Sequence, residues 1–221
     1  MRTAYAEIKI LPEDIRTAST EYKRVAAEAN SVYRLVSYSL RTQWGKLPEM
    51  VDALTVLLIT WNARFYNPGL FSQEALKEWL SGHLKILSEL RKRDIATLGD
   101  DDGGTIRELF CSLLPVLQPA LGKWKDRTSP VSVAKSLHLL EPGFFPAWDG
   151  YIAYQYGCDY TKAPSKRESK TDVVCEAYVR FCRKIQAVAA GLAATLPTSD
   201  TPLLKRIDEY NYIRITLPSQ Q

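Results

Sequence analysis

Residues 128–156 read TSPVSVAKSLHLLEPGFFPAWDGYIAYQY, and this segment has clear signals for where its helices begin and end. Ser129 and Pro130 predict the start of a helix, because serine caps a helix N-terminus and proline suits its first turn. Glu141-Pro142-Gly143 predicts the end of that helix. An aromatic turn follows, and Asp149 stands where a second helix would begin. The segment therefore predicts two helices joined by an aromatic turn.

Asp149 and Lys135 are the residues of this segment with the clearest catalytic potential. A carboxylate at the start of a helix accepts hydrogen bonds from two or three backbone N–H groups, which keep it ionised and oriented. Lys135 lies one helix upstream, within reach of the same cleft. Taken singly, an aspartate in this position is usually only a helix cap, and a lysine is usually solvated. In combination, both are candidate catalytic residues.

The composition is that of an ordinary globular protein. The chain has 221 residues, 46% of them hydrophobic and 24% charged, enough for one large domain or two closely packed ones. No apolar run approaches the length of a membrane span, and residues 1–14 lack the pattern of a secretory leader. We therefore expect a cytoplasmic protein with no membrane partner.

The cysteines and histidines predict neither a disulfide nor a metal site. The four cysteines include no C-x-x-C pair, and the two histidines have no ligand spacing around them. Cys175 and Cys182 are seven residues apart on one expected helix, about 10 Å along its axis, which is too far for a disulfide. The acidic stretch 100–102 lacks EF-hand spacing and is interpreted as a solvated linker. We expect four reduced thiols, no metal and no cofactor.

Positive charge is concentrated around the segment quoted above. The chain has a net charge of +4, and residues 115–170 hold eight lysines and arginines against five acids, or +3. An excess of this kind is expected where a polyanion docks, although a solvated face gives the same pattern. The candidate DNA-binding residues are Lys123, Lys125, Arg127, Ser129, Ser132, Lys162, Lys166 and Arg167.

Apolar residues recur at helical spacing over most of the chain. The expected helices cover residues 13–44, 48–66, 72–93, 105–115, 129–140, a short stretch from 149, 172–196 and 203–213, and one short strand is expected at 3–11. The fold class is therefore all-α, a globular fold of about eight helices with at most one or two short strands. We expect a single compact unit over residues 1–221 with two lobes, about 12–110 and 111–221, and the site between them.

The central segment resembles the helix-hairpin-helix superfamily of DNA glycosylases over about thirty residues. Val131-Ser132-Val133-Ala134-Lys135 aligns with the hairpin and lysine of that family, and Pro146-Ala147-Trp148-Asp149 with its Pro-x-x-Asp segment. Ser132 and Val133 replace the hairpin glycines, and the spacing of 14 from Lys135 to Asp149 is shorter than in well-known members. The resemblance implies a divergent member with the two-lobed helical shape of the family.

The activity that the resemblance implies is removal of a base from DNA. Such an enzyme flips a damaged or modified base out of double-stranded DNA and hydrolyses its N-glycosidic bond. Asp149 would stabilise the cationic sugar and orient the attacking water. Lys135 would add strand cleavage if its amine reached the sugar carbon, but the missing glycines favour hydrolysis alone. We expect a monomer, acting on oxidised or alkylated bases or, in antiviral defence, on modified pyrimidines of phage DNA such as glucosylated hydroxymethylcytosine.

Aromatic residues near the two candidate catalytic groups could form the pocket or wedge for the flipped base, since every base can stack on a ring. For Trp61, and for Phe144 beside them, packing in a helical core is the plainer interpretation. The candidates are the rings of Trp148, Phe145, Tyr151 and Trp61, together with Asn62, whose amide could contact the edge of a base.

Two other classes of function fit the same residues. A non-catalytic helical module could use the scaffold and the basic face to bind nucleic acid. A helical interaction protein unrelated to DNA would need neither Asp149 nor the basic face. A DNA glycosylase and a nucleic-acid-binding module should both bind DNA with a steep dependence on salt, whereas an interaction protein unrelated to DNA should not.

Overall fold

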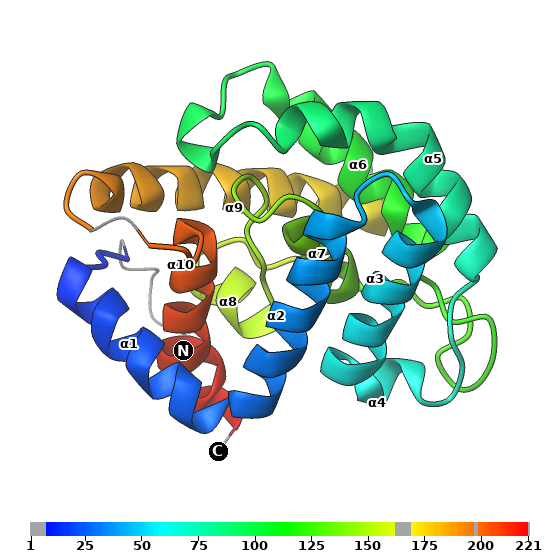
Figure 1. The fold of residues 1–221 in the computed structure, drawn as a ribbon, viewed down its shortest axis with the longest axis horizontal. Coiled ribbons are helices and arrows are strands. Elements are labelled where there is room, and N and C mark those ends of the chain that lie inside the picture. The colour runs from blue at the N-terminus through cyan, green and yellow to red at the C-terminus, as the bar shows by residue number, and fades with distance from the viewer. Residues whose placement is uncertain (1–7, 162–168, 197–198, 221) are drawn as a thin grey trace.

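The computed structural model describes residues 8–161, 169–196 and 199–220 (Figure 1). Within these residues the chain forms ten α-helices and no strand, so the predicted all-α class is confirmed. The strand expected at residues 3–11 falls mostly outside the described residues, and residues 8–11 form none. The helices are α1 (Pro12–Val25), α2 (Ala27–Thr42), α3 (Leu47–Trp61), α4 (Ala63–Tyr66), α5 (Gln73–Leu90), α6 (Asp102–Val116), α7 (Pro130–Leu140), α8 (Gly150–Gln155), α9 (Lys170–Ala193) and α10 (Leu203–Asn211).

Two of the expected helices are divided by corners. The helix expected over residues 13–44 breaks at Ala26, where φ is −123° and ψ is 36°, so α1 and α2 run in different directions. The helix expected over residues 48–66 breaks in the same way at Asn62, between α3 and α4. Neither corner contains a helix-breaking proline or glycine. The spacing of hydrophobic residues alone therefore did not predict either break in the helix.

The start of α6 also differs from expectation. The helix begins at Asp102 rather than at Thr105. The Asp102 carboxylate accepts two hydrogen bonds of 2.7 Å from the Arg93 guanidinium and a third from the Gly99 N–H. This pairing holds the pKa of Asp102 below its usual value. The last residue of the acidic stretch is therefore fixed at a helix start rather than free in a linker.

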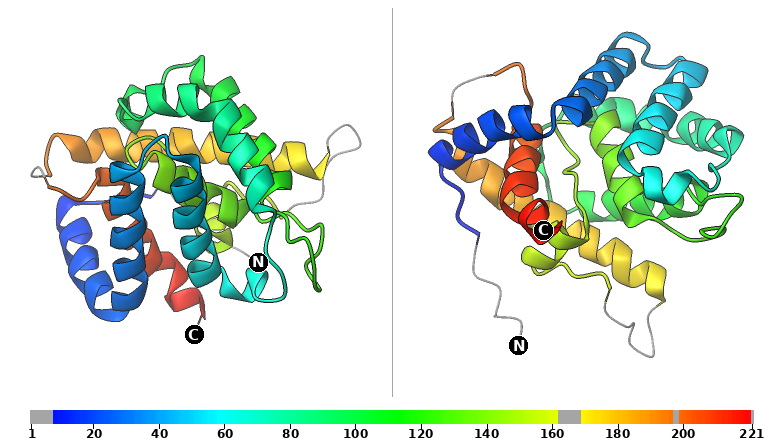
Figure 2. Two further views of the ribbon diagram at one scale, coloured as in Figure 1. Left: turned by 45° about the vertical axis from the view of Figure 1, so that its right-hand side comes forward. Right: turned by 90° about the horizontal axis from the view of Figure 1, so that it is seen from below.

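The C-terminal helices end near the candidate catalytic segment. Ser169 caps α9 by accepting from the Asp172 N–H, so Asp172 is the third residue of that turn and not the expected cap. α10 continues into a π-helical turn, Tyr212–Thr216. Both views in Figure 2 show α10 beside α1, so the end of the chain returns to its beginning.

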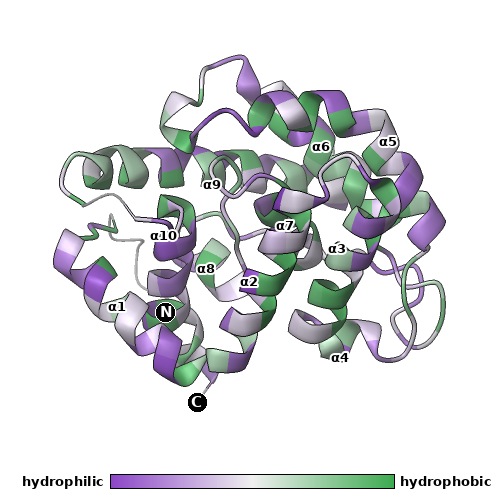
Figure 3. Cartoon of the chain, in the orientation of Figure 1, coloured by the Kyte–Doolittle hydropathy of each residue, from purple (hydrophilic) through white to green (hydrophobic). Residues whose placement is uncertain are grey.

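The centre of the molecule is α7, which is surrounded by other helices in Figure 1. Eight of its eleven residues are buried. A helix buried on nearly every side belongs in the middle of a fold, and Figure 3 shows apolar residues concentrated on the inward faces around it. One cluster of buried side chains extends from Ile15 on α1 through α7 to Ile207 on α10.

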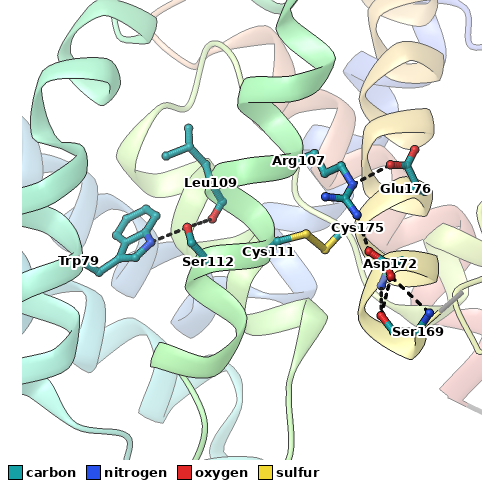
Figure 4. The surroundings of a disulfide bond; sticks show 9 residues. All are labelled: Trp79, Arg107, Leu109, Cys111, Ser112, Ser169, Asp172, Cys175 and Glu176. Carbon is teal, nitrogen blue, oxygen red and sulfur yellow. Dashed lines mark hydrogen bonds and ion pairs between the residues drawn. A yellow bond between two sulfur atoms is a disulfide. The ribbon is translucent and has the colours of Figure 1, made fainter.

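A disulfide joins α6 to α9, and this corrects the expectation of four reduced thiols. Cys111 and Cys175 are bonded across 64 residues of chain (Figure 4). On the same faces, Arg107 of α6 forms ion pairs with Asp172 and Glu176 of α9. Cys158 and Cys182 are buried free thiols. The sequence argument considered only Cys175 and Cys182, which lie on one helix. The bonded pair comes from two helices, α6 and α9, that pack side by side.

None of the helices in the described part of the chain is long and apolar enough to cross a membrane. The cytoplasmic location stays a prediction, and a disulfide is uncommon in that compartment.

Glu141, at the end of α7, is a buried carboxyl group with an unusual environment. Within the described residues neither of its carboxyl oxygens has a hydrogen-bond partner. The nearby Arg91 guanidinium donates to the Leu140 carbonyl instead. Burial raises the pKa of Glu141 to about 9, against a small opposing effect of Arg91. The folded protein therefore keeps this group protonated at neutral pH.

We expect Glu141→Gln to stabilise the protein at alkaline pH. Between the ordinary pKa of 4.5 and about 9, the folded state binds one more proton at Glu141 than the unfolded state does, so stability falls as pH rises through this window. Glutamine removes this loss. Urea unfolding at pH 5 and pH 8 should show a gain of about 1–3 kcal/mol for the variant at pH 8 and a smaller difference at pH 5. Glu89→Gln, at an exposed position, is the control, and equal pH slopes for all three proteins would contradict the assignment.

Candidate active site

A cavity of about 1310 Å³ opens where segments from both ends of the chain meet the central segment. Its walls come from the α1–α2 corner, the end of α3, α7, α8, α10 and the turn after α10. Five residues singled out from the sequence border it, namely Trp61, Lys135, Trp148, Asp149 and Tyr151.

Asp149 caps α8 as expected, and a second contact fixes it further. Its Oδ1 accepts from the Ile152 N–H at 2.9 Å, and its Oδ2 accepts from the Thr216 hydroxyl at 2.6 Å. Thr216 is buried and belongs to the π-helical turn near the end of the chain. The Asp149 side chain is partly exposed to the cavity. The carboxylate is thus held from two sides and still borders open space.

Lys135 borders the same cavity and is held by Asn62. The Lys135 Nζ donates to Asn62 Oδ1 at 2.7 Å and lies 5.4 Å from the centre of the Trp61 ring. The Asn62 Nδ2 donates to Ser132 Oγ at 2.6 Å, so both ends of the amide are engaged. In this arrangement Asn62 positions the lysine. Asn62 is not among the residues that border the cavity. Its expected contact with the edge of a base stays a prediction, and its place behind the cavity wall does not favour that contact.

The Lys135 amine titrates near neutral pH. Burial lowers its pKa from 10.5 to about 8, which is less than burial alone would give because Asp208 and Asp149 act in the opposite direction. The positive charge of Lys205 adds to the lowering.

Asp208 and Lys205 were not identified from the sequence. Asp208 borders the cavity, and its Oδ2 lies 2.9 Å from the Nζ of Lys205, which is 1% exposed. The Lys205 ammonium faces three rings, with its Nζ 4.4 Å from the centre of Tyr22, 4.7 Å from Tyr33 and 5.7 Å from Trp61. A lysine and an aspartate three residues apart on an amphipathic helix are usually a solvated pair, so their sequence contained no signal of this burial.

The candidate aromatic residues divide into those that face the cavity and those that do not. Tyr151 is 47% exposed, and Trp61 is partly exposed with its indole donating to the Ala29 carbonyl. Trp148 is only 1% exposed, because its indole donates to the Pro130 carbonyl and packs among other rings, so it supplies part of a wall and cannot act as a wedge. Phe145 is fully buried and does not border the cavity, which removes it from the set of base contacts.

The two serines proposed as DNA contacts lie inside the protein. Ser132 is fully buried and donates to Ser129 Oγ at 2.8 Å, and Ser129 accepts from the Ser132 N–H as the cap of α7. Residues 131–135 are helical, so no hairpin occupies the position that the resemblance indicated. These serines are therefore not placed to contact a phosphate, and the correction follows from the helix starting at Pro130.

The basic residues Lys123, Lys125 and Arg127 are exposed. Their turn is tied to the corner that holds Lys135, since the Trp124 indole donates to the Arg64 carbonyl at 3.1 Å and stacks on Phe65. Arg64 is two residues from Asn62, so the basic turn packs against the α3–α4 corner; none of its residues borders the cavity. Lys162, Lys166 and Arg167 lie outside the described residues.

Comparison with protein-family models, with curated proteins and with solved structures found no match for this chain. Among the residues that the structure describes, no group of histidine, cysteine and carboxylate side chains is arranged to hold a metal ion. The side chains at the cavity supply a fixed carboxylate, an amine with a lowered pKa and aromatic walls.

The state of Lys135 can be measured directly. We expect its rate of acylation by acetic anhydride, followed by mass spectrometry, to rise with pH around a midpoint of about 8, because the neutral amine is the reactive form. In urea the same lysine should return towards its ordinary value of 10.5, which provides an internal control. A midpoint above 10 in the folded protein would contradict the buried position of the amine.

Proposed function

We propose that the protein is a DNA N-glycosylase that flips a damaged or modified base into the cavity and hydrolyses its N-glycosidic bond. The observation that carries the proposal is the Asp149 carboxylate, fixed by two hydrogen bonds at the edge of a cavity of about 1310 Å³. That volume is ample for a nucleotide with its base turned out of the duplex.

The chemistry requires a fixed negative charge. As the base leaves with the bonding electrons, positive charge develops on the sugar, and a carboxylate beside the anomeric carbon stabilises it. Asp149 is suited to this role because the Ile152 N–H and the Thr216 hydroxyl both donate to it and favour its ionised form. Water then adds to the sugar carbon, Asp149 accepts the proton of the water, and the departing base gains a proton.

The aromatic side chains offer surfaces for the base. Flipping a base out of a duplex costs a few kcal/mol, and stacking on a ring returns about 1–3 kcal/mol per base. Tyr151, exposed at the rim, and Trp61, held by Ala29 and stacked on Tyr33, are the two rings best placed for this contact.

Double-stranded DNA would approach along the basic turn. Lys123, Lys125 and Arg127 are exposed and joined through Trp124 to the helix that follows Asn62. A backbone held there would place a neighbouring nucleotide near the cavity. Contacts of this kind make affinity fall with salt, at a slope set by the number of phosphates neutralised. We propose that one copy of the chain suffices.

Asp149→Asn tests the proposal. Released bases and abasic sites would be measured on a panel of DNAs with oxidised and alkylated bases and on phage genomes with modified pyrimidines, including glucosylated hydroxymethylcytosine. We expect the wild type to release one class of base and the variant to be at least about 100-fold slower, because the amide cannot offset the charge on the sugar.

DNA binding by Asp149→Asn should be retained, since the substitution leaves the basic turn intact. Asp52→Asn, which changes an exposed carboxylate on α3, is the matched control and should release base at the wild-type rate. Binding without base release from any DNA of the panel would instead identify a non-catalytic nucleic-acid-binding module. Absence of salt-dependent binding would exclude both.

A second activity, cleavage of the strand at the abasic site, is suggested by one observation. The Lys135 amine borders the cavity and its pKa is lowered to about 8, so part of it is neutral under physiological conditions. A neutral amine can add to the aldehyde carbon of the opened sugar and lose water, forming an imine that leads to strand cleavage. The sequence favours hydrolysis of the N-glycosidic bond without strand cleavage, and we propose this hydrolysis as the main activity.

Borohydride distinguishes the two activities, because it reduces an imine to a stable amine and traps the protein on DNA. With abasic-site DNA at pH 7, we expect weak trapping that increases towards pH 9 as Lys135 loses its proton. Lys135→Ala should abolish it. Complete absence of trapping up to pH 9 would show that the enzyme is purely hydrolytic.

A further inference from the structure

α10 contributes a second carboxylate to the cavity, and nothing in the proposed reaction yet uses it. The Asp208 side chain borders the cavity with 15% of its surface exposed. Its partner Lys205 lies behind it, enclosed by the rings of Tyr22, Tyr33 and Trp61.

The aromatic enclosure explains how two charged groups persist in the interior. Burying an ammonium group is unfavourable, but a carboxylate at 2.9 Å and three ring faces offset much of that penalty. In this arrangement the pKa of Asp208 is lowered, despite burial, by the charge of Lys205 and its hydrogen bond. The pKa of Lys205 is correspondingly raised by Asp208. Asp208 therefore stays ionised at the cavity wall.

Lys135 and the Asp208–Lys205 pair are close in space. The Nζ of Lys135 is 5.4 Å and the Nζ of Lys205 5.7 Å from the centre of the same Trp61 ring, and Asp208 and Lys135 border the same cavity. Burial lowers the pKa of the Lys135 amine, and of the two carboxylates that oppose this effect Asp208 is the stronger and Asp149 the weaker. The positive charge of Lys205 also lowers the pKa of Lys135, but its effect is smaller than that of either carboxylate. α10 as a whole therefore favours the protonated form of Lys135.

Glu28 and Asp159 are the other acids that border the cavity, and the following neighbours of Lys135 are neutral. The α3–α4 corner presents Asn62 and Trp61, which are neutral. Burial raises the pKa of Tyr22 and of Tyr33 to about 12, so both phenols are neutral at physiological pH. His138, on the same helix as Lys135, is buried with its pKa lowered and is neutral as well. The charge balance at Lys135 is thus set by Asp208, Asp149 and Lys205.

We propose that Asp208 is a positioning residue that acts through Lys135: kept ionised by Lys205, it retains the proton on the Lys135 amine at neutral pH and so directs the site towards hydrolysis and away from imine formation. A protonated amine has no lone pair for attack on the sugar carbon. The choice between the two reactions rests on the proposed N-glycosylase, whereas the effect on the charge of Lys135 does not.

The first test needs no DNA. In Asp208→Asn, the pH midpoint of Lys135 acylation should fall by about one unit relative to the wild type, because the opposing charge is lost. Asp149→Asn should lower the midpoint by less, in keeping with its weaker influence. Asp52→Asn is the matched control and should leave the midpoint unchanged.

Removing Asp208 alone leaves Lys205 buried without a counter-charge, which could unfold the protein. The double variant Asp208→Asn, Lys205→Met removes both charges and avoids this problem. Its midpoint should still fall, by less than in the single variant, because Asp208 outweighs Lys205 at Lys135. An unchanged or raised midpoint in a folded variant of either kind would overturn the proposal.

The second test concerns the reaction. Lowering the midpoint from about 8 to about 7 raises the neutral fraction of Lys135 at pH 7 about fivefold. Borohydride trapping on abasic-site DNA at pH 7 should increase by the same factor in Asp208→Asn and should be absent when Lys135→Ala is added. A lowered acylation midpoint without any trapping would support the effect of Asp208 on Lys135 and reject imine formation. Failure of the proposed function and failure of this inference therefore give different results.

Discussion

The hydrogen bond from the Thr216 hydroxyl to Asp149 is the contact on which the rest of the site depends. The bond from the Ile152 N–H alone would make Asp149 an ordinary helix cap. The second bond comes from a turn 67 residues later, and it joins the end of the chain to the central segment. The helix before that turn, α10, packs beside α1, and residues of both helices border the cavity. One short contact therefore links the fold of the termini to the geometry of the candidate active site.

The two carboxylates at the cavity, Asp149 and Asp208, have different partners. Asp149 is fixed by neutral donors, so its negative charge remains available to the cavity. Asp208 is paired with Lys205, which keeps it ionised, and its charge also raises the pKa of Lys135 across the cavity. Two carboxylates of the same type thus have different environments because their partners differ, and we propose different roles for them. The rings of Tyr22 and Tyr33 stabilise the buried Lys205 cation together with the carboxylates of Asp208 and Glu209.

Local rules predicted the local structure well. Ser129, Pro130 and Asp149 were placed correctly because helix caps depend on a few adjacent residues. The corners at Ala26 and Asn62 were missed, since each is imposed by packing and not by a breaking residue. The Cys111–Cys175 bond and the Asp208–Lys205 pair were missed for a related reason. Each depends on which helices pack together, and single-sequence periodicity contains no information on that choice. Ser132 and Phe145 were assigned to the surface of the site, but the central position of α7 and its following turn buries both.

The central claim is that Asp149 stabilises a positively charged sugar, and it can be tested before the excised base is known. Duplex DNA would be prepared with a pyrrolidine ring, which is cationic, or a tetrahydrofuran ring, which is neutral, in place of one nucleoside. The measurement is the ratio of the two dissociation constants for the wild-type protein. If Asp149 stabilises the cationic sugar, we expect at least about tenfold tighter binding of the cationic ring and loss of this preference in Asp149→Asn. Equal affinity of the wild type for the two DNAs would contradict it.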